Sequence, residues 1–440
     1  MQHLDRRSFL GLAGAGLTLT TPGLASSLTL AGGVAEPRRG PTLAVVFLRG
    51  GLDGLNLVVP HGEQAYHRLR PSLAIRRPGE PGGALDLDGF FGLHPAAAPL
   101  LEHFESGTGC AVHAVGSSAN TRSHFEEQDR WETAIDGSEL ETSGWLGRHL
   151  VHSEARGPVR AIALGENLTR SLRGEVTTLA LRGLDDLVPR GSAGDLERTL
   201  AALDKAYGRR GRGPTSGAGS QERSGAGMRE RGRAADLLER EGRASLDALA
   251  LLEDVARNPP ASRVEYPGTD LARRARELSR LIRADLGLEV ASLDLGGWDT
   301  HQNQGAAQGQ YSGRVAEVAG AIDALLRDLE DRLDEVLVLV VSEFGRTAAQ
   351  NGTGGTDHGN ASCVLAFGGA VRAARATGSG PVLGTWPGLE REQLNQQRDL
   401  RHTTDYRDVY AECLRFLGHE DPAPVLAGHE AVPLGLVRPS

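Results

Sequence analysis

Short apolar runs alternate with longer segments of helical periodicity along most of the chain. Seven runs, several without strict alternation, are typical of strands buried on both faces: Thr42–Leu48, Cys110–Gly116, Val159–Leu164, Val176–Leu181, Glu289–Leu295, Val336–Ser342 and Cys363–Gly368. Segments with a 3.6-residue period lie at 93–104, 124–135, 196–207, 234–255, 271–286, 310–333 and 406–417. The repeated order of strand, helix and strand predicts an α/β fold with a mostly parallel sheet flanked by helices on both faces.

One stretch interrupts this alternation. Residues 185–285 contain no convincing strand, and within them residues 208–233 are rich in Gly, Ser and Arg with almost no apolar side chains. That composition is typical of a flexible surface loop. We therefore expect a helical insertion at about 185–285 within a single α/β domain spanning 36–440. A separate helical domain is the alternative.

The N-terminal residues indicate an export signal. Arg6 and Arg7, followed by Ser-Phe-Leu, precede a Gly- and Ala-rich apolar stretch with small residues at 33–35. These features are typical of a twin-arginine signal peptide, and repeated glycines disfavour an ordinary N-terminal helix. We expect the twin-arginine export machinery to recognise residues 1–35 and to deliver a periplasmic or secreted protein. No later segment approaches the ~20 apolar residues of a membrane span, so we expect no transmembrane segment after signal removal.

Composition and charge narrow the classes of function. The 440 residues include 48 Lys and Arg against 57 Asp and Glu, a formal net charge of −9. This acidic balance argues against nucleic acid as a partner. The three cysteines, Cys110, Cys363 and Cys413, form no CxxC pattern. We expect three buried thiols, with one internal disulfide as the alternative.

Side chains suited to chemistry follow several of the predicted strands. In an open parallel sheet, ligands bind beyond the carboxyl ends of the strands, where loops and helix N-termini converge. Four carboxylates, two histidines and a hydroxyl fall at this edge: Asp53, Ser123, Asp299, His301, Glu343, Asp357 and His358. Carboxylate oxygen and imidazole nitrogen suit divalent ions such as Zn²⁺, Mn²⁺, Mg²⁺ or Ca²⁺. The set predicts metal-assisted hydrolysis of a small anionic ester.

Several of these residues also have simpler interpretations. Ser123, three residues before Glu126, matches a capping box at a helix start, so it is either a nucleophile or a helix cap. Glu343 is either a metal ligand or an ion-pair partner of Arg346. The arginines near the predicted strand ends are either anion clamps or solvated side chains: Arg49, Arg122 and Arg346. Four other histidines are expected to serve packing or hydrogen bonding: His94, His113, His124 and His149.

A resemblance to a known family connects these stretches. The motifs FLRGGLDGLNLVVP, FGLHPAAAPL, NTRSHFEEQDRWE, GWLGRHL, LGGWDTHQNQ, VLVLVVSEFGRT and GTDHGNAS resemble the bacterial domain of unknown function 1501 family. The resemblance runs from about Thr42 to near the C-terminus and is looser across 185–285. That family looks like a branch of the alkaline phosphatase and sulfatase superfamily. The resemblance therefore implies an alkaline-phosphatase-like fold and one or two divalent metals at the edge of the sheet.

The resemblance also implies roles for individual residues. It implies a nucleophile, Ser123, at the start of a helix, with metal ligands at strand ends: Asp53, Asp299, His301, Glu343 as a bridging carboxylate, and His358, with Asp357 beside the last of them. The sequence departs from the superfamily at Glu343-Phe344, where Asp-His is frequent, so one imidazole ligand is missing at that place.

Two functions from different classes follow. The first is an exported metal-dependent hydrolase of a phosphate or sulfate ester. The alternative is a non-catalytic envelope protein of the same fold that binds a partner protein or glycan, which the Glu343-Phe344 departure favours. A metal-free serine hydrolase is disfavoured because no G-x-S-x-G turn surrounds Ser123.

Overall fold

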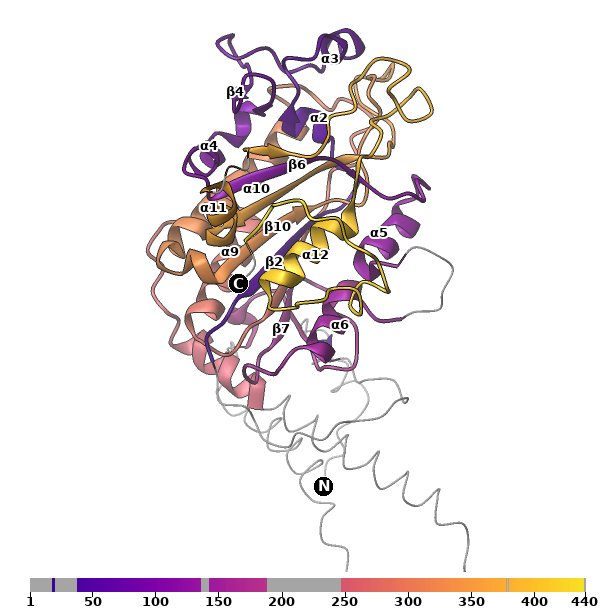
Figure 1. The fold of residues 1–440 in the computed structure, drawn as a ribbon. Helices are drawn as coiled ribbons and strands as arrows, with labels where there is room; N and C mark the ends of the chain where they lie inside the picture. The colour runs from indigo at the N-terminus through magenta and orange to yellow at the C-terminus, as the bar shows by residue number, and fades with distance from the viewer. Residues whose placement is uncertain are drawn as a thin grey trace, which may run out of the picture.

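The fold is built around one large twisted sheet (Figure 1). The computed structural model describes residues 18–19, 38–135, 142–187, 247–376, 378 and 380–438. Within these residues the sheet has ten strands, nine of them in the order β1 (Thr18–Leu19), β8 (Leu179–Leu181), β7 (Ala161–Leu164), β9 (Val290–Leu295), β2 (Thr42–Leu48), β10 (Val336–Val341), β11 (Ser362–Gly368), β6 (Gly109–Gly116) and β12 (Val382–Leu383). The tenth, β13 (Thr404–Asp405), pairs with β6.

The sheet is mixed but mostly parallel. Strands β8, β7, β9, β2 and β10 pair in parallel, whereas β11 is antiparallel to both β10 and β6. The reversal has a consequence for the site. Because β11 runs the other way, its first residue, Ser362, lies at the same edge as the last residues of the parallel strands. Each of the seven predicted strands is present, and the predicted α/β class is confirmed.

Continuous burial explains why the central strands are apolar throughout. Every residue of β2, β10 and β11 is buried, as expected for strands covered on both faces. Successive side chains of β2 point to opposite faces. Ala44 and Val46 belong to one hydrophobic core, while Val45 and Phe47 belong to the other.

Helices cover both faces (Figure 1). One core packs beneath α4 (Ala98–Glu105), α9 (Asp270–Arg283) and α10 (Gln310–Asp328). The other core packs against α5 (His124–Thr133), α6 (Trp145–His152), α11 (Gly369–Ala376) and α12 (Tyr406–Phe416). The predicted helices at 93–104, 124–135, 271–286, 310–333 and 406–417 correspond to α4 with the short helix η1 (Pro95–Ala97), α5, α9, α10 with η4 (Glu330–Glu335), and α12.

Smaller elements complete the described chain. They include α2 (Gly54–Leu57), α3 (Gln64–Leu69), η2 (Arg170–Leu172), η3 (Leu184–Leu187) and a three-stranded sheet of β3 (Val58–Val59), β5 (Gly92–Leu93) and β4 (Leu85–Asp86). This small sheet is absent from the sequence prediction because its two-residue strands carry no period.

The interrupted stretch is described only at its ends. Residues 247–257 are helical, and Ala248, Leu252 and Val255 pack into the same core as α9. The predicted helix at 196–207 and the predicted loop at 208–233 lie outside the described residues, as does most of the predicted signal at 1–35. Within the part of the chain that is described, no helix has both the length and the apolar character that crossing a membrane requires.

The cysteines follow the first of the two predictions. The thiols are free and buried at all three positions, Cys110, Cys363 and Cys413, so the alternative prediction of an internal disulfide is wrong. Burial raises the pKa of each thiol, which keeps these groups protonated and unreactive.

Candidate metal centre

Loops beside four strands meet at the carboxyl edge of the parallel sheet. His124 is the first residue of α5, which follows β6. Asp299 and His301 lie in the loop after β9, and Glu343 directly follows β10. His358 lies in the loop that leads into the antiparallel β11. Segments distant in the sequence therefore bring their side chains to one place, as the strand-end argument predicts.

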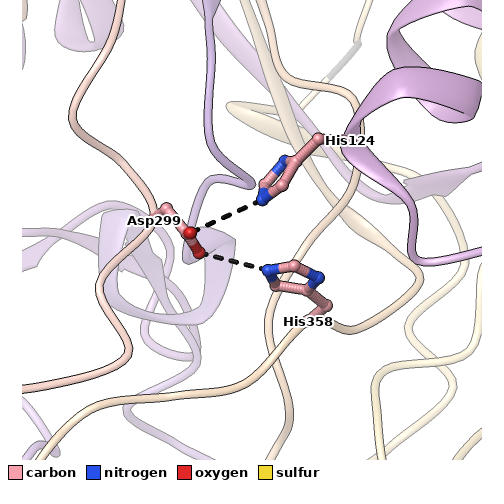
Figure 2. A group of neighbouring side chains, drawn as sticks. All are labelled: His124, Asp299 and His358. Carbon is pink, nitrogen blue, oxygen red and sulfur yellow. Dashed lines mark hydrogen bonds and ion pairs between the residues drawn. The ribbon is translucent and has the colours of Figure 1, made fainter.

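A histidine, an aspartate and a second histidine form a compact group (Figure 2). One ligand atom from each of His124, Asp299 and His358 lies within 4.8 Å of the others. The Nε2 atom of His358 is 3.1 Å from Asp299 Oδ1, and the Nε2 atom of His124 is 3.6 Å from Asp299 Oδ2. His301 joins the group, because its Nε2 atom is 3.0 Å from Asp299 Oδ1 and 3.0 Å from His358 Nε2.

The remaining ring nitrogen of each histidine has its own acceptor. The Nδ1 atom of His124 lies 2.8 Å from Glu343 Oε1, and that of His301 lies 3.0 Å from Asp357 Oδ1. The Nδ1 atom of His358 lies 2.9 Å from the carbonyl oxygen of Arg122. Such contacts fix the tautomer of a metal-binding histidine, with the proton on Nδ1 and a lone pair on Nε2. All three Nε2 atoms face Asp299.

These separations fit a tetrahedral cation. Ligand atoms about 2.0–2.1 Å from a tetrahedral zinc ion are about 3.3 Å from one another. Asp299 Oδ1 lies 3.0 and 3.1 Å from the Nε2 atoms of His301 and His358, and Asp299 Oδ2 lies 3.6 Å from that of His124, all close to this spacing. The Nε2 atom of His124 is also buried without a hydrogen-bond partner, as a nitrogen reserved for a metal would be. The described donors therefore suit a divalent cation, and their imidazole content favours zinc or manganese over magnesium or calcium.

Glu343 binds the ring nitrogen of His124 that does not face Asp299. Its carboxylate is buried and its Oε1 atom accepts from Gly50 N at 2.9 Å, from Gln128 Nε2 at 2.9 Å and from His124. Burial opposes ionisation, but the hydrogen bonds from His124 and Gln128 lower the pKa of Glu343 below its ordinary value. In return, the hydrogen bond to Glu343 raises the pKa of His124. Glu343 is thus placed to orient a ligand.

Arg346 holds Asp299. Its guanidinium is fully buried and donates to Asp299 Oδ1 at 2.6 Å, to the Trp298 carbonyl at 3.0 Å and to the Gly51 carbonyl at 2.9 Å. Burial opposes ionisation of Asp299, but the Arg346 hydrogen bond lowers the pKa of that carboxyl below its ordinary value. The alternative in which Arg346 pairs with Glu343 is therefore wrong.

Phe344 packs against two of the ligand rings. Its centroid is 4.8 Å from that of His124 and 4.9 Å from that of His358. Gly51, with φ +76, makes this possible, since a Cβ atom there would lie 2.4 Å from the phenyl ring. Phe344 therefore restricts the positions of two imidazole rings, those of His124 and His358.

Ser123 and Arg122 lie next to the group through the backbone. Ser123 is the N-cap residue of α5, as predicted, but its side chain makes no capping hydrogen bond. The predicted start of the helix at Ser123 is therefore confirmed, whereas the predicted capping hydrogen bond of its side chain is wrong. Arg122 has φ 57, which turns its carbonyl toward His358, and its guanidinium donates to Asp399 Oδ1 at 2.9 Å.

Asp53 has hydrogen-bond partners other than the three grouped residues. Its carboxylate is buried, and Oδ2 accepts from Arg70 Nη1 at 2.7 Å and from Gln304 Nε2 at 2.5 Å. Within the described chain it makes no hydrogen bond or ion pair with His124, Asp299 or His358. The structure thus brings Asp299, His301 and His358 into direct contact. Glu343 and Asp357 accept hydrogen bonds from histidines of the group, whereas Asp53 does not contact the group through a hydrogen bond or ion pair.

His124 is the residue that sequence reasoning missed. The predicted hydrogen bonding and packing of His124 are confirmed by its contacts with Glu343 and Phe344, but its place in the compact group was not predicted. A signal was present in the sequence, because the residue directly follows Ser123 at a predicted helix start on the ligand edge of the sheet.

Comparisons with known proteins give one family match and several distant structural matches. The family model described as "Protein of unknown function (DUF1501)" matches residues 106–417. Among solved structures, "Crystal structure of Ps i-CgsB in complex with k-i-k-neocarrahexaose" is 10% identical and covers 88% of this chain and 74% of that chain, with a TM-score of 0.36. No curated protein matches the chain. The family match includes His124, Asp299 and His358 and begins after Asp53.

Proposed function

This chain belongs to the DUF1501 family, and from the geometry of its sheet edge we propose that it is an exported metal-dependent hydrolase that acts on a phosphate or sulfate ester. The observation that carries the proposal is the arrangement of His124, His301 and His358 around Asp299. Each ring has its Nδ1 atom occupied by an acceptor and its Nε2 atom directed at the carboxylate. Such preparation is typical of metal-binding histidines.

A divalent cation held here would supply a Lewis acid and a positive charge beside the ester oxygens. The protein supports that role in two ways. Arg346 keeps Asp299 ionised, and Glu343 keeps His124 in place. All three arginines expected as anion clamps, Arg49, Arg122 and Arg346, already donate to carboxylates of the protein. We therefore assign them to positioning.

Ser123 is the proposed nucleophile. Its hydroxyl makes no capping bond although it stands at the N-terminus of the ten-residue helix α5, where backbone N–H groups favour a bound anion. In the proposed reaction, the serine oxygen bonds to phosphorus or sulfur and the alcohol leaves with the serine proton. Water then cleaves the serine ester, which releases phosphate or sulfate and restores the hydroxyl.

The alternative function is a binding protein of the envelope that uses the same centre structurally. The observation that favours it is the absence of a free guanidinium among Arg122 and Arg346, because an anionic ester would then meet no arginine clamp from these two residues.

Metal analysis followed by an ester panel tests the proposal. We expect protein purified after export to contain zinc or manganese and to hydrolyse a phosphate or sulfate ester. Ser123→Ala should abolish turnover and retain the metal, whereas Ser118→Ala in the same loop should retain both. Metal binding without hydrolysis of any ester would favour the alternative. Turnover that survives Ser123→Ala would exclude the serine route.

Export is a separate part of the proposal and needs its own test. Replacement of Arg6 and Arg7 by lysine should leave the protein in the cytoplasm if the twin-arginine signal is used. Export that continues unchanged in the double variant would contradict this route.

A further inference from the structure

We propose that Gln304 is a positioning residue whose side-chain amide ties the two loops of the metal centre to each other and to a buried ion pair. This inference rests on the proposed metal centre. Gln304 is fully buried and lies three residues after His301. It contacts no metal ligand through its side chain, so any influence on the metal must act through its neighbours.

The amide has one partner in each loop. Its Oε1 atom accepts from Thr300 Oγ1 at 2.9 Å and from Thr356 Oγ1 at 2.7 Å. Thr300 lies between Asp299 and His301, whereas Thr356 directly precedes Asp357 and His358. One acceptor atom therefore joins the backbones that carry three of the four grouped side chains.

The other end of the amide is anchored in the core. Its Nε2 atom donates to Asp53 Oδ2 at 2.5 Å, and the same oxygen accepts from Arg70. Because a carboxylate only accepts hydrogen bonds, the amide nitrogen must face Asp53 and the amide oxygen must face the two threonines. The buried carboxylate thus sets the orientation that the loops need.

Arg70 extends the anchor to the first part of the second loop, after the end of β10. Its guanidinium donates to the carbonyls of Thr347 and Ala348 at 2.8 and 2.9 Å. These residues follow Arg346, which holds Asp299. Removing either partner of a buried ion pair is strongly destabilising, so Gln304 is the member of this network best suited to substitution.

Backbone hydrogen bonds also join the two loops, so the side-chain amide of Gln304 is not their only connection. Thr356 N donates to Thr300 O at 3.1 Å, and Gln304 N donates to Gly354 O at 2.9 Å. The loops are therefore already paired, and the amide fixes the spacing of that pairing. Without it, we expect the loops to stay folded but to hold Asp299 and His358 less closely in register.

Zinc affinity of Gln304→Met tests the inference. Methionine keeps the length of the side chain and removes all three hydrogen bonds. Outer partners of metal ligands typically contribute 10–100-fold to affinity, and we expect a loss of about tenfold, measured by competition with a chromophoric chelator. Gln308→Met, an exposed position in the same loop, should bind zinc as the wild type does.

Two further variants separate positioning from general destabilisation. Leu339→Ala in β10 lowers stability away from the loops and should leave zinc affinity unchanged. Thr356→Val removes one bond to the amide, and combining it with Gln304→Met should cost no more affinity than Gln304→Met alone, since both changes break the same contact. Additive losses, an unchanged affinity in Gln304→Met, or an equal loss in Leu339→Ala would overturn the inference.

Hydrogen exchange tests the same coupling without metal. In Gln304→Met, the backbone N–H groups at positions 304 and 356 should both exchange faster than in the wild type. If the wild type binds no zinc, the proposed function fails, yet paired acceleration of both loops would still support the role of Gln304. Acceleration in one loop only, or in neither, would contradict it.

Discussion

Replacing Glu343 by glutamine changes the charge behind His124 while leaving the shape nearly intact. The Oε1 atom of Glu343 accepts from Gly50 N, His124 Nδ1 and Gln128 Nε2 at 2.8–2.9 Å. The amide oxygen of glutamine can occupy that position. The amide nitrogen then takes the place of Oε2 and faces Ser342 Oγ, which can accept from it while donating to the Leu48 carbonyl at 2.7 Å. The three donors that face Oε1 therefore keep their acceptor, and one N–H of the new amide gains Ser342 Oγ as an acceptor.

The loss of charge should weaken the metal centre by a defined amount. Substituting an outer partner of a metal-binding histidine typically costs 10–100-fold in affinity, which corresponds to about 1.4–2.8 kcal/mol. We expect Glu343→Gln to fall within this range, because it removes the charge of a fully buried carboxylate that contacts His124. The unfolding temperature without metal should change little.

Calorimetric titration with zinc at pH 8 measures this prediction, since few protons compete for the imidazoles at that pH. Glu126→Gln, an exposed position on the same helix, removes the same charge and serves as the control. An affinity of Glu343→Gln equal to that of the wild type would refute the assignment of Glu343 as the partner that prepares His124.

Further predictions concern the second histidine, metal removal, the core and acid stability. Asp357→Asn should weaken zinc binding about tenfold in the same titration, because it removes the charged acceptor of His301 Nδ1. A free zinc concentration 100 times the Kd should stabilise the protein by about 2.7 kcal/mol, so a chelator should lower Tm in a scan. Leu339→Ala should destabilise the fold by about 2–5 kcal/mol in denaturant, because the side chain is fully buried. Burial and a neighbouring histidine lower the pKa of His419 to about 4, and hydrogen bonds, which outweigh the opposing effect of burial, lower that of Glu289 to about 2. Each group therefore contributes stability that is fully present above its unfolded pKa and is lost on acidification. The contribution of His419 is lost between about pH 6.5 and 4, and that of Glu289 between about pH 4.5 and 2. A Tm that stays constant from pH 7 to pH 4 would contradict the first loss, and one that stays constant from pH 4 to pH 2 would contradict the second.

The sheet could be predicted from the sequence because burial on both faces leaves a clear pattern. The apolar runs in β2 and β10 need no partner to be identified as strands. The direction of β11 could not be predicted, since a run such as Cys363–Gly368 is equally apolar in either orientation. The small sheet of β3, β4 and β5 was missed because its strands of two residues are held by neighbours distant in the sequence.

The candidate site also has residues that could be predicted from the sequence and residues that could not. Asp299, His301 and His358 could be predicted because the strand-end argument places them at one edge. Asp53 satisfies the same argument, yet its carboxylate contacts Arg70 and Gln304. That contact depends on how α2 and α3 pack, which a strand pattern does not contain. His124 was missed because a polar residue at a helix start has many ordinary uses.

The measurement that tests the central claim most directly is anomalous diffraction at the zinc edge from crystals of the zinc-loaded protein. The account predicts one strong peak within bonding distance of His124 Nε2, His358 Nε2 and a carboxylate oxygen of Asp299. A peak located elsewhere, or none at zinc concentrations that saturate binding in solution, would contradict the assignment of this group as a metal centre.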